Sequence, residues 1–321
     1  MNIFITGENG FIAKNLKQRS KHFENMNIVT GAVDYLNMHK KGEPCVYQNS
    51  IDQWKLFFEY NKVDVIIHNA AAVGTDVVAL DVTQSTRTNV EGTYNICRAA
   101  KALDIPVCYI GTTVIYDVKQ YQETEITENS EKSPHTLYGC QKLCAEDIIK
   151  SQTNEWMIVR PLFAYGGEGD MNSLIAKSIY AALNRKTQID MFLDKDKIKD
   201  YMHVYDFTDG VLTAIQQQLW MSDWNIAAET PIKTGDIIRI IEKTCDIDLA
   251  DVVQWHTKTD YLGNHRLSSK SFRSVAGWSP CISLSEGIKM TFESILQSEG
   301  YNPLRYLEEA KRRNIDLTEF Y

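Results

Sequence analysis

Tyr138 and Lys142 stand four residues apart, at the two ends of the stretch Tyr138-Gly139-Cys140-Gln141-Lys142. On an α-helix this spacing puts both side chains on one face, so the lysine ammonium can reach the phenol or a bound ribose. A nearby cation lowers the pKa of a tyrosine from about 10 toward neutrality, which makes the phenol a usable general acid/base. The alternative is an accidental pair on a surface helix.

Thr112 and Thr113 follow Gly111 at the end of a predicted strand. Their hydroxyls could hydrogen-bond the substrate oxygen on which the tyrosine acts. Hydride would then pass between the substrate carbon and a nicotinamide, because a redox cofactor carries the difficult chemistry of such a step. A Tyr-x-x-x-Lys string is common, but downstream of such a strand end and of a dinucleotide turn it becomes much more specific.

The turn that would hold the dinucleotide runs from Thr6 to Ala13, directly after an apolar N-terminal strand. Gly7 permits the tight turn, and Gly10 lets the backbone approach the pyrophosphate. The helix that follows offers N–H groups and a positive dipole end to the phosphates. This context favours a dinucleotide site over a plain structural turn. The expected cofactor-binding residues of the turn are Gly7, Asn9, Gly10, Phe11 and Ile12.

The choice of dinucleotide depends on the residue that reads the adenosine ribose. Asp34 lies 24 positions after Gly10 and is the best acidic candidate, since the motif expects one about 20 residues on. A carboxylate there favours NAD, while Lys40 or Lys41 could accept the 2′-phosphate of NADP. Asp34 could instead be an ordinary loop residue. The expected cofactor is NAD, with NADP possible.

A third stretch, His68-Asn69-Ala70-Ala71-Ala72, ends another predicted strand. Open α/β sheets bind ligands at the carboxyl edge of their strands, and the small side chains of Ala70 and Ala71 would leave room for a dinucleotide there. His68 itself is expected to be a packed structural histidine, because it has no partner at catalytic spacing.

These candidate residues need a parallel sheet to hold them. In the first half of the chain, short apolar runs alternate with helix-length segments, and parallel neighbours require such crossover connections. The pattern predicts an α/β fold with a Rossmann-type doubly wound parallel sheet. Strands are expected at 3–6, 27–33, 63–68, 106–110 and 156–159, and helices at 13–20, 85–103 and 138–151.

From about residue 160 the pattern loosens. The second half favours a smaller C-terminal α/β substrate-binding cap packed on the first domain. The predicted domains are residues 1–160, to which a segment near 201–230 returns, and residues 161–321. Helices are expected here at 172–184, 234–243 and 284–297, and strands at 188–193, 224–227 and 252–255.

Composition excludes several classes of protein. The 321 residues are 44% hydrophobic and 24% charged, with a net charge of -8 and no basic block, which argues against a nucleic-acid partner. No apolar run is long enough for a membrane span, and no signal peptide is evident. The seven cysteines include no C-x-x-C pair, so we expect reduced thiols, no metal site and a cytoplasmic protein.

Taken together, five stretches in this order resemble the extended short-chain dehydrogenase/reductase family, in its branch of NAD-dependent nucleotide-sugar epimerases, dehydratases and reductases. The resemblance runs over nearly the whole chain, which makes it more specific than any single motif. The stretches are Thr6 to Ala13, His68 to Ala72, Gly111 to Tyr116, Tyr138 to Lys142 and Lys199 to Asp206.

The resemblance implies roles for residues that spacing alone does not assign. Thr112, Tyr138 and Lys142 would be catalytic. Tyr138 and Lys142 would also contact the cofactor, and Asn89 would pack beside it. Arg266 would face the diphosphate of a nucleotide sugar, and the remaining expected substrate contacts are Thr113, Phe163 and Lys199. Relatives often form homodimers through two helices, which would here cover 85–103 and 138–151.

Two departures from the family narrow the chemistry. Thr113 and Val114 stand where 4,6-dehydratases carry an acid pair after the threonine, so dehydration is disfavoured. Phe163 and Lys199 replace a common Asn and Arg, which leaves the substrate contacts open. A 4-epimerase and a 4-keto reductase both remain. A simple ketone reductase and a non-catalytic dinucleotide-sensing protein on the same fold are also compatible with these residues.

Overall fold

The computed structural model describes residues 1–29, 50–170, 173–184, 188–191, 193–256 and 262–297. The chain divides into two compact units, which are described separately. The first comprises Met1–Ile115, Lys132–Arg160 and Val211–Trp224, and the second comprises Tyr116–Glu131, Pro161–Gly210 and Asn225–Tyr321. Residues 116–131 lie within the predicted first domain but group with the second unit.

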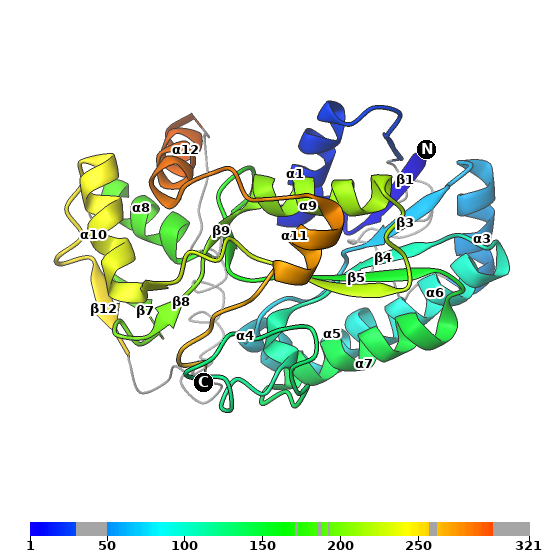
Figure 1. The fold of residues 1–321 in the computed structure, drawn as a ribbon, viewed down its shortest axis with the longest axis horizontal. Coiled ribbons are helices and arrows are strands. Elements are labelled where there is room, and N and C mark those ends of the chain that lie inside the picture. Colours follow the sequence, from blue (N-terminus) through cyan, green and yellow to red (C-terminus); the bar gives the residue numbers. More distant parts are fainter. Residues whose placement is uncertain (30–49, 171–172, 185–187, 192, 257–261, 298–321) are drawn as a thin grey trace. The chain divides into compact units, whose positions relative to one another are not determined.

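The first unit contains a six-stranded sheet with the strand order β10-β5-β4-β3-β1-β2 (Figure 1). Strands β1 to β5 pair in parallel with their neighbours. Because β1 lies between β2 and β3, the strand order reverses there, and open α/β sheets bind ligands at the carboxyl ends of strands at such a point. The strands are β1 (Asn2–Thr6), β2 (Asn27–Val29), β3 (Val65–His68), β4 (Val107–Ile110), β5 (Trp156–Pro161) and β10 (Ser222–Ile226).

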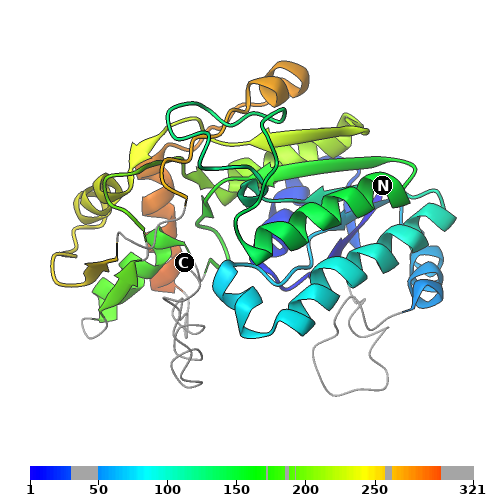
Figure 2. The same cartoon turned by 90° about the horizontal axis from the view of Figure 1, so that it is seen from below.

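Helices cover both faces of this sheet. Helix α1 (Phe11–Arg19) lies on one face, and α3 (Ile51–Tyr60), α6 (Gly92–Ala102) and α7 (Leu137–Gln152) lie on the other (Figure 1, Figure 2). On the second face, the ring of Trp54 stacks on Phe58 at 5.7 Å and lies 5.8 Å from Phe4. Burial of these aromatic rings holds α3 against the sheet.

The chain between β3 and α6 is more broken than its apolar pattern predicts. The single helix expected at 85–103 is divided into α5 (Val82–Thr86), the π-helical turn η3 (Arg87–Glu91) and α6, and is preceded by α4 (Thr75–Leu80). A π-helical turn accommodates one extra residue in an otherwise continuous helix, and such turns are frequent at functional sites. Asn89 lies in this turn.

The second unit has its own apolar core, formed by residues such as Ile175, Ile237 and Ile288. Its helices are α8 (Leu174–Asn184), α9 (Val204–Gln216, which continues into the first unit), α10 (Thr234–Cys245), α11 (Lys270–Ala276) and α12 (Leu284–Gln297). Its short strands pair as β6 (Ala164–Tyr165) with β9 (Met202–His203), β7 (Ile189–Met191) with β12 (Val253–Trp255), and β8 (Ile198–Lys199) with β11 (Ile232–Lys233).

The predicted fold class is confirmed: the sheet is parallel through β1 to β5, is flanked by helices and has the doubly wound order. The second strand, expected at 27–33, is seen as β2, and residues 30–33 lie outside the described residues. Within the described part of the chain, no helix combines the length and apolar character that crossing a membrane requires.

Candidate active site

The turn between β1 and α1 brings the backbone of Gly7 against the end of β3. Gly7 has a φ of 67°, and a Cβ at this position would lie 2.9 Å from the Cα of Ala70. The N–H of Gly10 donates to the carbonyl of Gly7 at 2.9 Å and closes the turn. Any side chain at Gly7 would strain the backbone and push Ala70 away.

Helix α1 then begins at Phe11, and its N-cap residue Gly10 provides no side-chain cap. A helix start without a side-chain cap presents backbone N–H donors and a positive dipole end, which is the arrangement that binds phosphate. Gly7, Asn9 and Gly10 are exposed, and Phe11 and Ile12 are half-buried. This cradle of small residues and backbone donors fits the pyrophosphate of a dinucleotide.

Behind this turn, His68 is wholly buried and links two threonines. Its Nδ1 lies 2.8 Å from the hydroxyl of Thr6, and its Nε2 lies 2.9 Å from the hydroxyl of Thr93. Burial, with a smaller effect from the nearby Lys142, lowers the pKa of His68 to about 3. The imidazole is therefore neutral at physiological pH, and His68 serves as a structural link between the strand ends and α6.

Asn89 in the π-helical turn fixes the loop that follows β3. Its side chain accepts a hydrogen bond from the N–H of Ala72 at 2.8 Å and donates to the Ala72 carbonyl at 3.0 Å. It also donates to the side chain of Gln141 on α7 at 2.8 Å. Asn89 thereby joins the loop of Ala70 and Ala71, both half-buried, to the helix that carries the tyrosine and the lysine.

Lys142 is buried at the end of β4. Its ammonium donates to the carbonyl of Ile110 at 2.7 Å and lies 4.1 Å from the ring centroid of Tyr109. Burial lowers the pKa of Lys142 to about 7, and the carboxylate of Glu146 acts in the opposite direction. A lysine that titrates near neutrality is suited to tuning a neighbouring acid/base.

Tyr138 enters the same region from the first turn of α7. Thr136 caps this helix by accepting from the N–H of Gly139 at 3.1 Å. A Cβ at Gly139 would lie only 2.7 Å from the carbonyl of Val114, so the helix start packs tightly on the turn η4 (Thr113–Ile115) that follows β4. Tyr138 is largely buried, with 8% of its surface exposed.

Thr112 and Thr113 differ in solvent exposure. Thr113 is buried at 2% exposure, whereas Thr112 is half-buried. The hydroxyl of Thr112 also accepts from the N–H of Val114 at 3.4 Å. Of the two, Thr112 is the better placed to meet a substrate oxygen.

The predicted substrate residues Phe163, Lys199 and Arg266 all lie in the second unit. Lys199 is wholly buried, and its ammonium donates to the carbonyl of Gly263 at 2.8 Å and lies 5.7 Å from the ring centroid of Phe163. The Phe163 ring stacks on Tyr201 at 5.3 Å, and the backbone of Phe163 has a φ of 36°. Arg266 is half-buried.

Two further residues of the second unit lie beside Phe163 and Arg266 but were not among the predicted site residues. His265 is wholly buried at 5.9 Å from the Phe163 ring, and neither ring nitrogen has a hydrogen-bond partner among the described residues. Gln122 accepts from the N–H of Asn264 at 2.8 Å, and its backbone carbonyl accepts from Arg266 at 3.4 Å. His265 had a signal, since it adjoins Arg266 in sequence, whereas Gln122 had none.

The first unit thus brings the predicted cofactor and catalytic residues together at the carboxyl ends of the adjacent strands β1, β3 and β4. The predicted ribose contact, Asp34, lies outside the described residues. Among the described residues no cluster of three His, Cys, Asp or Glu side chains could hold a metal ion. The arrangement fits a dinucleotide at the glycine turn and places Lys142, one helical turn after Tyr138, at the end of β4.

Comparison with known proteins gives a consistent picture. A family model described as the NAD dependent epimerase/dehydratase family matches residues 3–227. GDP-6-deoxy-D-talose 4-dehydrogenase from Aggregatibacter actinomycetemcomitans is 26% identical over 258 residues, which cover 78% of this chain and 81% of that protein. Mouse dTDP-D-glucose 4,6-dehydratase is 24% identical over 255 residues, covering 74% of this chain and 69% of that protein.

Solved structures share the fold at lower sequence identity. UDP-glucuronic acid 4-epimerase from Bacillus cereus, in complex with UDP-glucuronic acid and NAD, superposes with a TM-score of 0.79 at 19% identity. The superposition covers 92% of this chain and 99% of that one. The fold and the family match thus agree.

Proposed function

The chain belongs to the NAD dependent epimerase/dehydratase family, and from that premise we propose that it moves hydride at C4 of a nucleoside-diphosphate sugar, as a 4-epimerase or a 4-keto reductase. The observation that carries the proposal is the position of Tyr138 and Lys142, which lie one helical turn apart on α7 beside the end of β4. Relatives that act at C4, such as the B. cereus epimerase, support the choice of position on the sugar.

NAD fits the cradle at Gly7 and Gly10, and when bound there it would supply the hydride chemistry. In the oxidising direction Tyr138, as phenolate, takes the proton of the C4 hydroxyl, and the C4–H bond breaks as the ketone forms. In the reducing direction the phenol returns the proton to the ketone oxygen. Lys142 favours the phenolate by its positive charge, and Thr112 holds the reacting oxygen.

Dehydration is a poorer fit to these residues, although dehydratases are among the relatives. It needs an acid and a base next to the catalytic threonine, and the positions are held by Thr113 and Val114. Thr113 is also buried, and neither side chain titrates in the range that such a step requires.

The first test is to denature the purified protein and quantify the nicotinamide cofactor that it releases. Near-stoichiometric NAD supports an epimerase, because an epimerase recycles its cofactor in place. A cofactor-free protein that consumes NADH or NADPH with 4-keto sugars supports a reductase. A protein that neither holds nor binds a nicotinamide dinucleotide would refute the proposal.

A simple ketone reductase is the second candidate. It shares the tyrosine and the lysine but has no use for a nucleotide pocket. Competition by UDP, GDP or dTDP against turnover separates the two, since a ketone reductase should be indifferent to all three. A non-catalytic dinucleotide-sensing protein, in turn, would bind NAD and turn over neither class of substrate.

We also propose that the protein is a homodimer joined through α6 and α7. A surface hollow of about 340 Å³ lies on this side of the first unit, and Tyr94 beside it is 42% exposed. Its lining residues are Thr86, Arg87, Val90, Glu91, Tyr94 and Ile148. Light scattering at micromolar concentration should give twice the chain mass, and Tyr94→Glu should shift it toward the monomer. A monomeric wild-type protein contradicts the dimer.

A further inference from the structure

Helix α7 carries a third buried polar residue on the stripe that begins with Tyr138 and Lys142. Glu146 follows Lys142 by four residues, as Lys142 follows Tyr138, so the three side chains lie on one face of the helix. Glu146 is 1% exposed, which is unusual for a carboxylate unless it is paired. This side chain has no part in the proton transfer proposed for Tyr138.

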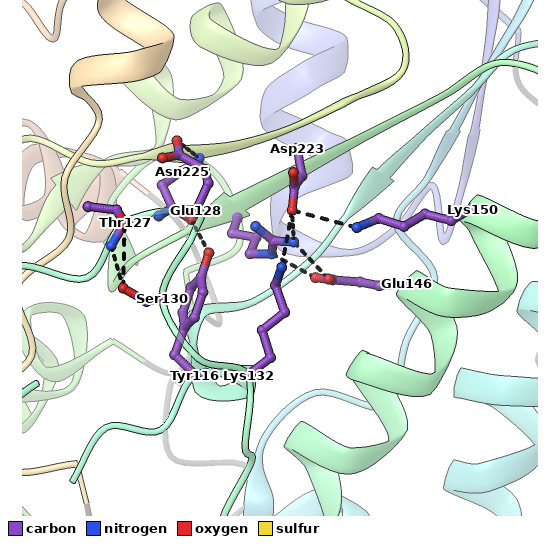
Figure 3. A network of polar contacts seen from close by, with 10 residues as sticks. Tyr116, Thr127, Glu128, Ser130, Lys132, Glu146, Lys150, Asp223 and Asn225 are labelled. Atoms are coloured by element: carbon purple, nitrogen blue, oxygen red, sulfur yellow. Dashed lines mark hydrogen bonds and ion pairs between the residues drawn. The ribbon is translucent and has the colours of Figure 1, made fainter. Parts of the chain in front are cut away.

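Glu146 forms a two-point ion pair with Arg160 of β5. Its two carboxylate oxygens accept from Nε and from one terminal nitrogen of Arg160, each at 2.8 Å. Arg160 is wholly buried, and it also donates to Asp223 of β10 at 2.5 Å. Asp223 in turn lies 3.5 Å from the ammonium of Lys132 and 3.7 Å from that of Lys150 (Figure 3).

The pair also packs against the residue that precedes Thr112. A Cβ placed on Gly111 would lie 3.0 Å from a carboxylate oxygen of Glu146 and 3.1 Å from Cγ of Arg160. The ion pair therefore contacts α7, β5 and the end of β4 at one point. A shift of α7 along its axis would break a two-point ion pair in the protein interior, where an unpaired charge is strongly disfavoured.

We propose that Glu146 is a positioning residue for the active site, which through Arg160 fixes α7 against the end of β4 and supplies the buried negative charge that keeps Lys142 an ammonium. The proposal rests on the proposed function only in naming Lys142 as catalytic. Glu146 acts through Lys142 and touches no reacting atom.

The charges around Lys142 support this role. Among the described residues, Glu146 from α7 and His68 from β3 interact electrostatically with Lys142, and the ring of Tyr109 from β4 lies beneath its ammonium. Tyr138 precedes Lys142 by one helical turn. Burial keeps His68 and Tyr109 neutral at pH 7, since it lowers the pKa of the imidazole and raises that of the phenol. Glu146 is thus the group that opposes the effect of burial on Lys142.

The positive charge of Arg160 offsets only part of the effect that Glu146 has on the pKa of Lys142. This single charge is shared between the carboxylates of Glu146 and Asp223, while Lys132 and Lys150 compensate Asp223 from the other side. Loss of Glu146 should therefore make Lys142 lose its proton at lower pH.

The test is an NMR titration of protein labelled with [13Cε]lysine, in which the signal missing from Lys142→Arg identifies Lys142. Lys142 in wild-type protein should titrate near pH 7, and in Glu146→Gln its pKa should fall by about one pH unit or more. Asp147→Asn removes a charge from the neighbouring exposed position and should leave the titration unchanged. Glu146→Asp, which retains the carboxylate, should restore most of the wild-type value.

An unchanged Lys142 titration in folded Glu146→Gln overturns the proposal. Should that variant fail to fold, Asp223→Asn provides the same test. In this variant Glu146 alone balances the positive charge of Arg160, so less uncompensated negative charge acts on Lys142 and its pKa should again fall. An unchanged pKa would contradict the proposal. Both titrations need no substrate, so their failure is distinguishable from a failure of the proposed hydride transfer.

Discussion

His68 in the first unit and His265 in the second are equally buried, but their surroundings differ. Both ring nitrogens of His68 are hydrogen-bonded, to Thr6 and Thr93, whereas neither ring nitrogen of His265 has a partner among the described residues. Burial lowers the pKa of each to about 3. Buried polar groups are nearly always paired, so the difference needs a physical reason.

The contrast extends to the residues around each histidine. In the first unit, Asn89 bonds to the backbone of the loop after β3 and Lys142 to the end of β4, and both so fix the site before any ligand binds. In the second unit, Nε of the half-buried Arg266 also has no partner among the described residues. The first region is built to hold its own geometry, and the second retains hydrogen-bonding capacity that a polar ligand could use.

The largest expected effect is a loss of stability at acid pH. Because each histidine has a lower pKa folded than unfolded, the unfolded chain binds more protons between pH 6.5 and about 3, and stability falls as the pH falls through this range. Each histidine should lower the free energy of unfolding by roughly 4 kcal/mol when the pH reaches about 3. Urea unfolding as a function of pH measures the loss. A pH dependence that is equally steep in His68→Leu and wild type would show that His68 is protonated in the folded state.

The second effect separates the two histidines at neutral pH. His68→Leu removes one hydrogen bond from each of two buried hydroxyls, although Thr6 and Thr93 keep backbone partners, and should destabilise the protein by about 2–3 kcal/mol. His265→Leu removes a group with unpaired nitrogens and should change stability by less than about 1 kcal/mol, in either direction. Urea unfolding at pH 7.5 measures both. Equal losses of unfolding free energy in the two variants would contradict the difference in hydrogen bonding between the two histidines.

The smallest effect concerns Gln122, which ties two loops of the second unit together. Its side-chain amide donates to the carbonyls of Leu262 and Asn264 and accepts from the N–H of Asn264. Gln122→Met keeps the length but loses these bonds, and should cost about 1–2 kcal/mol of unfolding free energy. Gln120→Met, at an exposed position nearby, serves as the control and should cost less. A larger loss for the control contradicts the role given to Gln122.

The same contrast explains what the sequence could predict. Gly7, Tyr138 and Lys142 lie in a strand–turn–helix and on one helix face, where local geometry sets relative positions, and the fold class follows from the alternation of strands and helices. Gln122 meets residues 262–266 only through the tertiary fold. The break in the helix at Arg87–Glu91 was not predicted, because the apolar pattern runs on through it. Glu146 follows Lys142 at the same four-residue spacing and could have been noticed in the sequence. Its partner Arg160 lies on another element, so the ion pair could not be predicted.

The roles of the site residues stay predictions until the chemistry is measured. The most direct test rapidly mixes NAD-loaded wild type and Tyr138→Phe with a set of UDP-, GDP- and dTDP-hexoses. It follows the absorbance of reduced nicotinamide within the first turnover, before an epimerase would return the hydride. Wild type should reduce its cofactor with at least one sugar nucleotide, while Tyr138→Phe should still bind NAD and react about 10²–10⁴ times more slowly. Equal rates in the two proteins would contradict the assignment of Tyr138 as the acid/base.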